Sequence, residues 1–122
     1  VKRVGLKAAT VRAVAMGPDG KRLFASLGDD VVEFSLETLK EVRRFPEPDA
    51  TALAMSPTGD RLAIARQTDT IAVMNIDGEP SLQIYNMGNS TNGRPRVGWS
   101  YDGSMMFGCG SGGLSVWKMD AK

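Results

Sequence analysis

Short apolar runs, separated by polar and turn-forming residues, recur along this chain in three similar units. In each unit one run ends at Met16, Met55 or Trp99, and two further runs follow, each after a turn-like segment. Apolar and polar positions alternate only partly within the runs, which is typical of strands whose two faces are both covered by neighbouring sheets. The pattern therefore predicts an all-β chain built from repeated sheets.

The repeat gives each expected strand a place in its unit. The segments between consecutive runs are short and suit tight hairpins, so we expect antiparallel, up-and-down sheets. Residues 2–6 precede the first inner strand much as residues 42–45 precede the second, which favours an outer strand there. We expect inner strands near 11–16, 51–55 and 96–99, second strands near 22–27, 61–66 and 105–109, third strands near 31–35, 70–75 and 114–118, and outer strands near 40–45 and 81–86.

A turn pentapeptide follows the first run of every unit. Proline presets the backbone at the second turn position, and the final glycine can adopt the positive φ that closes a hairpin. The copies begin 39 (55 − 16) and 44 (99 − 55) residues apart, in line with the roughly 40–45 residues of a four-stranded propeller blade. They are Met16-Gly17-Pro18-Asp19-Gly20, Met55-Ser56-Pro57-Thr58-Gly59 and Trp99-Ser100-Tyr101-Asp102-Gly103.

Residues 35–45 also fit a short helix, because Leu36, Leu39 and Val42 have helical spacing. The aligned residues 75–80 of the next unit contain glycine and proline, however, and these residues end helices. The comparison of units therefore favours a turn followed by an outer strand.

Two motifs carry a resemblance to a known family. Residues 56–59 and 100–103 resemble the Ser-Pro-Asp-Gly turn of WD40-repeat β-propellers, and residues 114–118 resemble the end of their third strand. The Gly-His pair of that family is missing, and Trp117 is followed by lysine instead of aspartate. The resemblance implies antiparallel four-stranded β-propeller blades, arranged as a partial propeller of about three divergent blades.

These blades divide the chain. We expect an outer strand of a preceding or neighbouring blade at 1–7, blades at 11–46 and 50–87, and a blade lacking its outer strand at 95–119. Propellers close with four to eight blades, so three should leave apolar faces and strand edges exposed. Either the chain, which begins without methionine, is a segment of a longer propeller, or two copies assemble head to tail into six blades.

Composition excludes several classes of function. The 122 residues carry a net charge of +1, so no overall field draws the chain to nucleic acid or an anionic membrane. The chain contains no histidine and one cysteine, which excludes His-based triads, internal disulfides and Cys-rich zinc sites. We expect no cofactor or metal, an intracellular location in cytoplasm or nucleus, and a buried, inert thiol at Cys109.

Several smaller motifs have ordinary structural explanations. Residues 108–113 contain Gly-x-Gly-x-x-Gly, but a dinucleotide loop needs a following helix, so we expect a glycine-rich strand and hairpin. Basic clusters at 2–7 and 40–44 fall on expected outer strands, where charge protects exposed edges. We therefore expect no direct nucleic-acid binding.

The longest insertion in the repeat, residues 87–95, is the best candidate for recognition, because loops that lengthen on a rigid scaffold often carry binding. Our candidate partner-binding residues are Asn89, Asn92, Arg94 and Arg96.

The leading hypothesis is a noncatalytic, WD40-like scaffold for protein–protein interaction within a multiprotein assembly. It rests on fold analogy and on the missing catalytic residue types. One alternative is an enzyme or small-ligand binder whose site lies in the channel of a completed ring. Another is a designed or evolutionary-model fragment that assembles with itself into a closed propeller.

Overall fold

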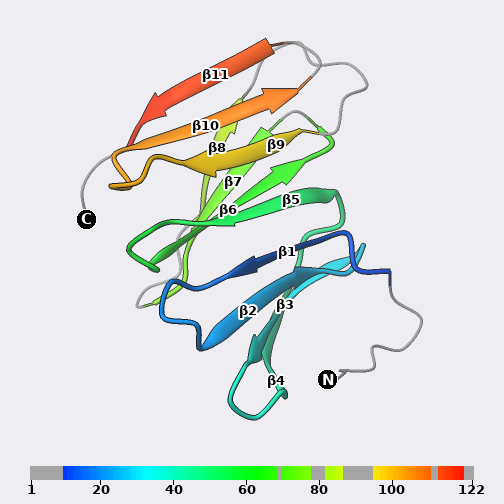
Figure 1. The fold of residues 1–122 in the computed structure, drawn as a ribbon. Helices are drawn as coiled ribbons and strands as arrows, with labels where there is room; N and C mark the ends of the chain where they lie inside the picture. Colours follow the sequence, from blue (N-terminus) through cyan, green and yellow to red (C-terminus); the bar gives the residue numbers. More distant parts are fainter. Residues whose placement is uncertain (1–9, 69, 78–81, 87–94, 111–112, 120–122) are drawn as a thin grey trace.

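The computed structural model describes residues 10–68, 70–77, 82–86, 95–110 and 113–119. All the regular secondary structure in these segments is β-strand, arranged in three antiparallel sheets (Figure 1). The strands of the first sheet are β1 (Ala13–Met16), β2 (Arg22–Ser26), β3 (Asp30–Ser35) and β4 (Glu41–Pro46). Those of the second are β5 (Ala50–Met55), β6 (Arg61–Arg66), β7 (Thr70–Asn75) and β8 (Leu82–Asn86), and those of the third are β9 (Arg96–Trp99), β10 (Met105–Gly110) and β11 (Gly113–Lys118).

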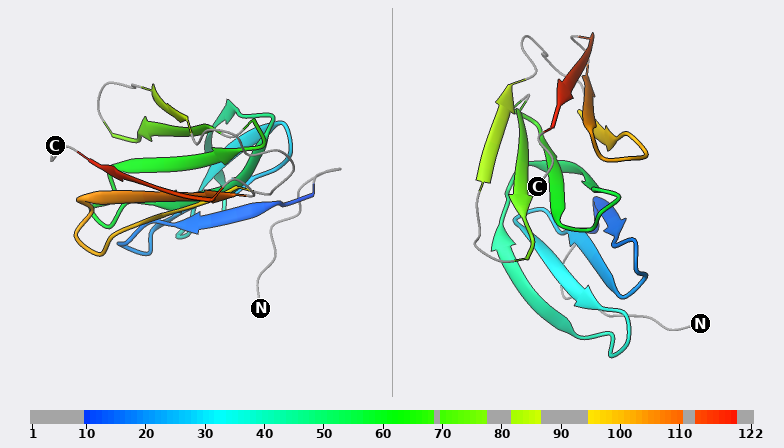
Figure 2. Two further views of the ribbon diagram at one scale, coloured as in Figure 1. Left: turned by 90° about the horizontal axis from the view of Figure 1, so that it is seen from above. Right: turned by 90° about the vertical axis from the view of Figure 1, so that its left-hand side faces the viewer.

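Each sheet is an up-and-down meander, in which every strand pairs with the next one along the chain. The first strands of the sheets are neighbours, with β5 in contact with both β1 and β9. A side view shows these first strands at one side of the stack and the outer strands β4 and β8 at the opposite side (Figure 2). The expected strands of all three units are confirmed to within two residues at each end. Residues 2–6, the expected additional outer strand, lie outside the described residues.

The three turn pentapeptides close the first hairpin of each sheet. Gly20, Gly59 and Gly103 have φ values of 72°, 82° and 78°, and each amide donates a hydrogen bond to the carbonyl three residues before it. Residues other than glycine rarely adopt this backbone conformation. The predicted role of the final glycine is confirmed.

Successive turns also contact one another between sheets. A Cβ added to Gly59 would lie 3.1 Å from Cγ of Pro18, and one added to Gly103 would lie 3.6 Å from Cδ of Pro57. At Gly20, which belongs to the first turn, such a Cβ would meet nothing within 4 Å. The proline of one turn therefore packs on the glycine of the following turn.

The middle sheet is covered on both faces. On one side Phe24 and Val31 of the first sheet pack against Leu62 and Ile64. On the other side Ile71 lies in a cluster with Met106 of the third sheet. Every residue from Leu62 to Ala65 is fully buried, so β6 shows no alternation of exposure along these four positions. This explains why the apolar pattern of the sequence alternates only partly.

The outer faces of the first and third sheets expose apolar side chains. Val14 and Met16 of β1 are 56% and 57% exposed, and Leu114 and Val116 of β11 are 71% and 51% exposed. Within the described part of the chain, β11 pairs with β10 alone. The expectation of uncovered apolar faces is therefore confirmed for the third sheet. On the first sheet it holds only at β1, because Ala25 and Val32, which lie on the same face as Val14, are 2% and 0% exposed.

The prediction of a buried thiol is wrong, because Cys109 is exposed. Met106 and Gly108 of β10 are buried, and Met106 faces the second sheet. Side chains alternate between the faces of a strand, so Cys109 lies on the opposite face with the exposed Leu114, its partner in the ladder. No described sheet covers that face.

The two helical alternatives do not form in the described residues. Residues 36–38 make a turn that leads into β4, as predicted. The glycine-rich segment belongs to the hairpin of β10 and β11, in which Gly110 pairs with Gly113, so the predicted strand and hairpin are confirmed. The described segments contain no helix long and apolar enough to cross a membrane.

Candidate functional site

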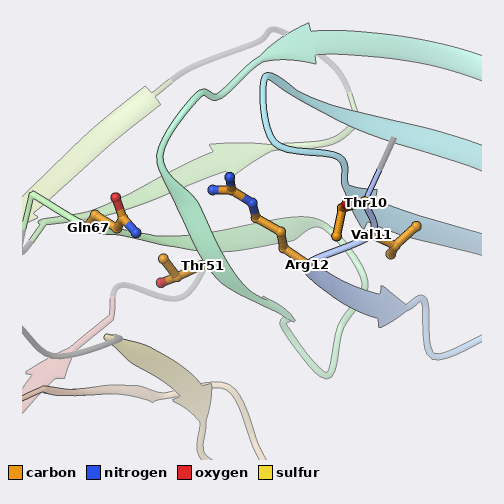
Figure 3. Close-up of a pocket in the computed structure, with 5 residues that line it drawn as sticks. All are labelled: Thr10, Val11, Arg12, Thr51 and Gln67. Carbon is orange, nitrogen blue, oxygen red and sulfur yellow. The ribbon is translucent and has the colours of Figure 1, made fainter. Parts of the chain in front are cut away.

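Two hollows lie side by side where the first strands of the sheets begin. The first, of about 450 Å³, is lined by Thr10, Val11, Arg12, Thr51 and Gln67 (Figure 3). The second, of about 300 Å³, shares Arg12 and Thr51 with the first. Its other described lining residues are Ala13, Val14, Ala52, Leu53, Pro95 and Arg96. The hollows therefore border β1, β5 and β9 in turn.

Thr51 is set between the hollows by a β-bulge. Ala50 pairs with Arg66 and Ala52 with Ala65, so Thr51 is an extra residue in β5. Its hydroxyl is 3.0 Å from the carbonyl oxygen of Pro95 and 3.3 Å from that of Ala65, and it donates to these acceptors. A bulge bends a strand and redirects a side chain. Here the redirected hydroxyl connects the start of β5 to Pro95, which leads into β9.

Arg12 enters the first hollow from the start of β1. Its backbone amide donates a 2.8 Å hydrogen bond to the carbonyl of Ser26, while its side chain is exposed. Nε and Nη2 lie 4.0 Å from the position of a Cβ added to Gly28, which has a φ of 101°. Glycine at position 28 thus adopts the positive φ that the backbone requires there, and its lack of a side chain leaves space beside the guanidinium of Arg12. In Figure 3 the side chain of Arg12 extends toward Thr51 and Gln67.

A buried ion pair holds the loop beside Gln67. Nε of Arg66 is 2.9 Å from Oε1 of Glu47, and Nη2 is 2.7 Å from Oε2. The hydrogen bonds to Glu47 raise the pKa of Arg66, against the smaller opposing effect of burial. The amide of Gln67 donates to the carbonyl of Asp49 at 3.0 Å, and that of Glu47 donates to Asp29 at 3.0 Å. Gln67 is therefore held at the edge of the first hollow by its backbone.

Only one of the four predicted contact residues can be placed. Arg96 begins β9, is exposed and lines the second hollow. Asn89, Asn92 and Arg94 lie outside the described residues.

Sequence reasoning missed Arg12, Thr51 and Gln67. Arg12 and Thr51 each stand four positions before the turn pentapeptide of their unit. Equivalent positions of a repeat lie side by side in the stack. An alignment of the units would therefore have placed Arg12 and Thr51 next to each other.

A second charged cluster joins the first two sheets away from these hollows. Nε of Arg43 donates to Oε1 of the buried Glu33 at 2.6 Å, and its Nη2 donates to the carbonyl of Ile76 at 2.9 Å. Arg22 lies 3.9 Å from Glu33 and 3.3 Å from Asp77. A hollow of about 500 Å³ borders this cluster. Acid and base are balanced there, and the contacts connect β3 and β4 with the loop after β7.

Arg44, in the predicted basic cluster of the first outer strand, is also paired. It bonds both carboxylate oxygens of Glu41 at 2.9 Å and lies 3.1 Å from Asp30. The hydrogen bond from Arg44 lowers the pKa of Glu41, and the bonds to Glu41 and Asp30 raise the pKa of Arg44. The charge of this strand is thus largely engaged within the first sheet. Lys2, Arg3 and Lys7 lie outside the described residues.

The aspartates in the turns bind neighbouring donors. Asp102 accepts from the amide and hydroxyl of Ser104 at 3.0 and 2.7 Å and from the hydroxyl of Ser100 at 2.9 Å. These bonds lower its pKa to about 2. Asp60 accepts from Thr58 and Ser56, and the bond from Thr58 is the main cause of its lowered pKa. Among the described side chains, no group of three or more Cys, Asp or Glu could hold a metal ion.

Comparison with known proteins places the fold. No family model matches the chain, and no curated protein matches it. A structure titled crystal structure of RRP9 WD40 repeats is 13% identical, with a TM-score of 0.81 over 93% of this chain and 37% of that one. The U3-55K structure is 14% identical, with a TM-score of 0.80 over 93% and 37%. Hydrazine synthase of Kuenenia stuttgartiensis is 21% identical, with a TM-score of 0.79 over 96% and 35%.

These matches and the sheets described above confirm the predicted fold class and the resemblance to WD40 repeats. The three sheets are antiparallel β-propeller blades whose fold resembles that of the solved WD40 repeats, two with four described strands and one with three. The chain spans little more than a third of the length of each solved structure that it matches here.

Proposed function

We propose that this chain is a noncatalytic propeller segment that serves as a scaffold for protein–protein interaction, and that a protein partner lies over the hollows between Thr10 and Arg96. One observation carries the proposal. Arg12, which lines both hollows, and Arg96, which lines the second, are exposed, and no acidic residue is among the described lining residues of either hollow. Such a surface offers unsatisfied cationic donors to a partner.

The composition of this surface supports a protein as the partner. Arginine is enriched in protein interfaces, and polar groups around apolar patches are typical of them. The arginines here accompany the polar Thr10 and Gln67 and the exposed Val11. The surface therefore combines the apolar area and the directional groups that a protein contact uses.

The residue types support a noncatalytic role. The chain contains no histidine, and the carboxylates with lowered pKa values, such as Asp60 and Asp102, bind their own turns. A general acid or base needs a pKa near the working pH and access to substrate. The fold itself is neutral on this question, because hydrazine synthase is among the structures matched.

Photo-crosslinking followed by reconstitution tests the proposal. The full chain carries p-benzoylphenylalanine at Gln67, or at the exposed Lys21 of a turn between β1 and β2 as a control, and is irradiated in extract of its source cells. The adduct specific to position 67 is identified by mass, purified and titrated against the chain. We expect the double variant Arg12→Glu, Arg96→Glu to lose binding and Lys21→Glu to retain it. A partner that binds both variants equally, or a substrate turned over by the chain, would contradict the proposal.

The apolar side chains exposed on β1 and β11 support completion of the ring by further blades, from a longer chain or from a second copy. Val14 and Met16 mark one face, and Leu114 and Val116 mark the other. Light scattering after size-exclusion chromatography measures the mass of the folded species. A dimer favours the six-bladed assembly, whereas a stable monomer contradicts self-assembly.

A further inference from the structure

We infer that the hollow around Arg12 binds a carboxylate of an extended acidic peptide segment, with Arg96 receiving a second carboxylate of the same segment. This inference rests on the proposed function, because it names the chemistry of the protein partner at that surface. It assigns the main contact to Arg12, a residue outside the insertion that the sequence pattern favours.

Arg12 and Arg96 differ from the other arginines that the structure describes. Arg22, Arg43, Arg44 and Arg66 each form an ion pair with a carboxylate of the chain. Arg61 lies with its guanidinium carbon 5.3 Å from the centre of the Trp99 ring. Within the described segments, neither Arg12 nor Arg96 has an ion pair or an aromatic partner. Their donors are therefore available to a ligand.

The hydrogen-bond donors that line the first hollow suit a carboxylate ligand. The guanidinium of Arg12 presents donors in a plane that matches two carboxylate oxygens. The amide of Gln67 and the hydroxyl of Thr10 add neutral donors at the same hollow (Figure 3). Thr51 already donates its hydroxyl proton to backbone carbonyls, so it lines the hollow without donating to the ligand.

The neighbouring carboxylate of the loop does not fill this role. Glu47 is 4% exposed and is bound through both oxygens by Arg66. The loop is thus held without consuming the donors of Arg12. A carboxylate that binds Arg12 in this hollow would come from outside the described lining residues.

The arrangement favours a peptide over a nucleic acid. Single-stranded nucleic acids are bound by a continuous cationic track with aromatic side chains for base stacking. No aromatic residue is among the described residues that line either hollow. The exposed Val11 lines the first hollow beside Arg12. Separate charges with apolar surface beside them match a strand whose acidic and apolar side chains alternate.

The test uses the full chain and synthetic probes. The acidic probe is a short acetylated peptide in which Glu alternates with Val, and the neutral control has Gln in place of every Glu. A short oligothymidylate and inorganic phosphate are the other probes. Binding is measured by calorimetry, and the side-chain amide signal of Gln67 is followed by NMR.

We expect the acidic peptide to bind and to shift the Gln67 signal, with the Gln peptide and phosphate much weaker. Arg12→Ala should weaken binding about tenfold or more, because charge-assisted hydrogen bonds are lost. Arg12→Lys should retain part of the affinity, and Arg96→Ala should have a smaller effect. Lys21→Ala, an exposed change in a turn away from the hollows, should have none.

Three results with the synthetic probes would overturn the inference. They are equal binding of the Glu and Gln peptides, equal losses in Arg12→Ala and Lys21→Ala, and tighter binding of oligothymidylate than of the acidic peptide. Circular dichroism of each variant, together with Arg12→Lys, guards against loss of fold. If a reconstituted partner binds Arg12→Ala and Arg12→Lys as tightly as the unchanged chain, this inference is wrong and the scaffold role stands. If the acidic peptide binds as expected but no protein partner binds the chain, the scaffold role is wrong and the carboxylate site stands.

Discussion

Arg66 donates two hydrogen bonds to the carboxylate of Glu47, 2.9 Å from Nε to Oε1 and 2.7 Å from Nη2 to Oε2. The side chain of Glu47 is 4% exposed, and that of Arg66 is 23% exposed. The pair connects the segment between the first two blades to β6 of the second blade. It therefore fixes the loop on which the neighbouring hollow depends.

Removing one partner of this pair should destabilise the fold. We expect Glu47→Ala to lower the free energy of unfolding by about 2–3 kcal/mol, below the range for fully buried pairs because Arg66 is partly exposed. Urea denaturation measures this change. Glu41→Ala, which breaks the exposed pair with Arg44, should have a much smaller effect. Equal losses in the two variants would show that burial of Glu47 contributes nothing.

The glycines of the turns should differ in their tolerance of a methyl group. Gly20→Ala should cost about 1–2 kcal/mol, because alanine is strained at positive φ. Gly59→Ala should cost more, because its Cβ also meets the rigid ring of Pro18 at 3.1 Å. The midpoints of thermal or urea unfolding give the order. A Gly59→Ala variant no less stable than Gly20→Ala would contradict the contact between turns.

Asp102 should make stability depend on acid pH. Its pKa of about 2 lies below its ordinary value of 3.8, so the folded protein binds this proton more weakly than the unfolded chain. The contribution of the ionised group is present above about pH 4 and is lost as the pH falls toward about 2. NMR titration of the carboxyl carbon measures the midpoint. Ser104→Ala, which removes one donor, should move the midpoint upward.

The indole of Trp99 should contribute to the contact between the second and third blades. Its Nε1 donates a 3.1 Å hydrogen bond to the carbonyl of Ala54. Trp99→Phe should therefore lower stability by about 1 kcal/mol through this bond, in addition to any loss of packing. Trp117→Phe keeps an aromatic ring against Tyr85, 5.5 Å away between centroids, and is the matched control. A smaller loss for Trp99→Phe than for this control would argue against the bond.

Cys109 should react quickly with a thiol reagent in the folded chain. The side chain is exposed on the outer face of the third blade. Ellman's reagent should modify it in native buffer at a rate close to that in denaturant. Strong protection in a species that light scattering shows to be monomeric would contradict the exposure, whereas protection in an oligomer would place this face in the interface.

The fold followed from local signals in the sequence. The apolar runs located β6 and β7 at their observed bounds, and the turn pentapeptides identified three of the five described glycines that adopt positive φ. These features depend on residues close together in the chain. Hydrophobic periodicity and turn chemistry report them directly.

The candidate site depends on contacts that no local pattern reports. The bulge that places Thr51 is set by pairing with β6, and the hollow that Arg12 lines is formed with Thr51 and Gln67, which are far from it in the sequence. Cys109 is exposed because its strand, β10, belongs to the last described blade. The equivalent strand of the middle sheet, β6, is covered on both faces. Burial could therefore not be assigned from residue type alone.

The contacts between turns give the array a direction. Proline occupies the third position of the first two turn pentapeptides and meets the glycine of the next, whereas the third pentapeptide has Tyr101 there, 99% exposed. The three blades are thus not interchangeable modules. Exchanging the first two in a shuffled gene would keep a proline against each following glycine, but moving the third inward would replace one of these prolines with a tyrosine.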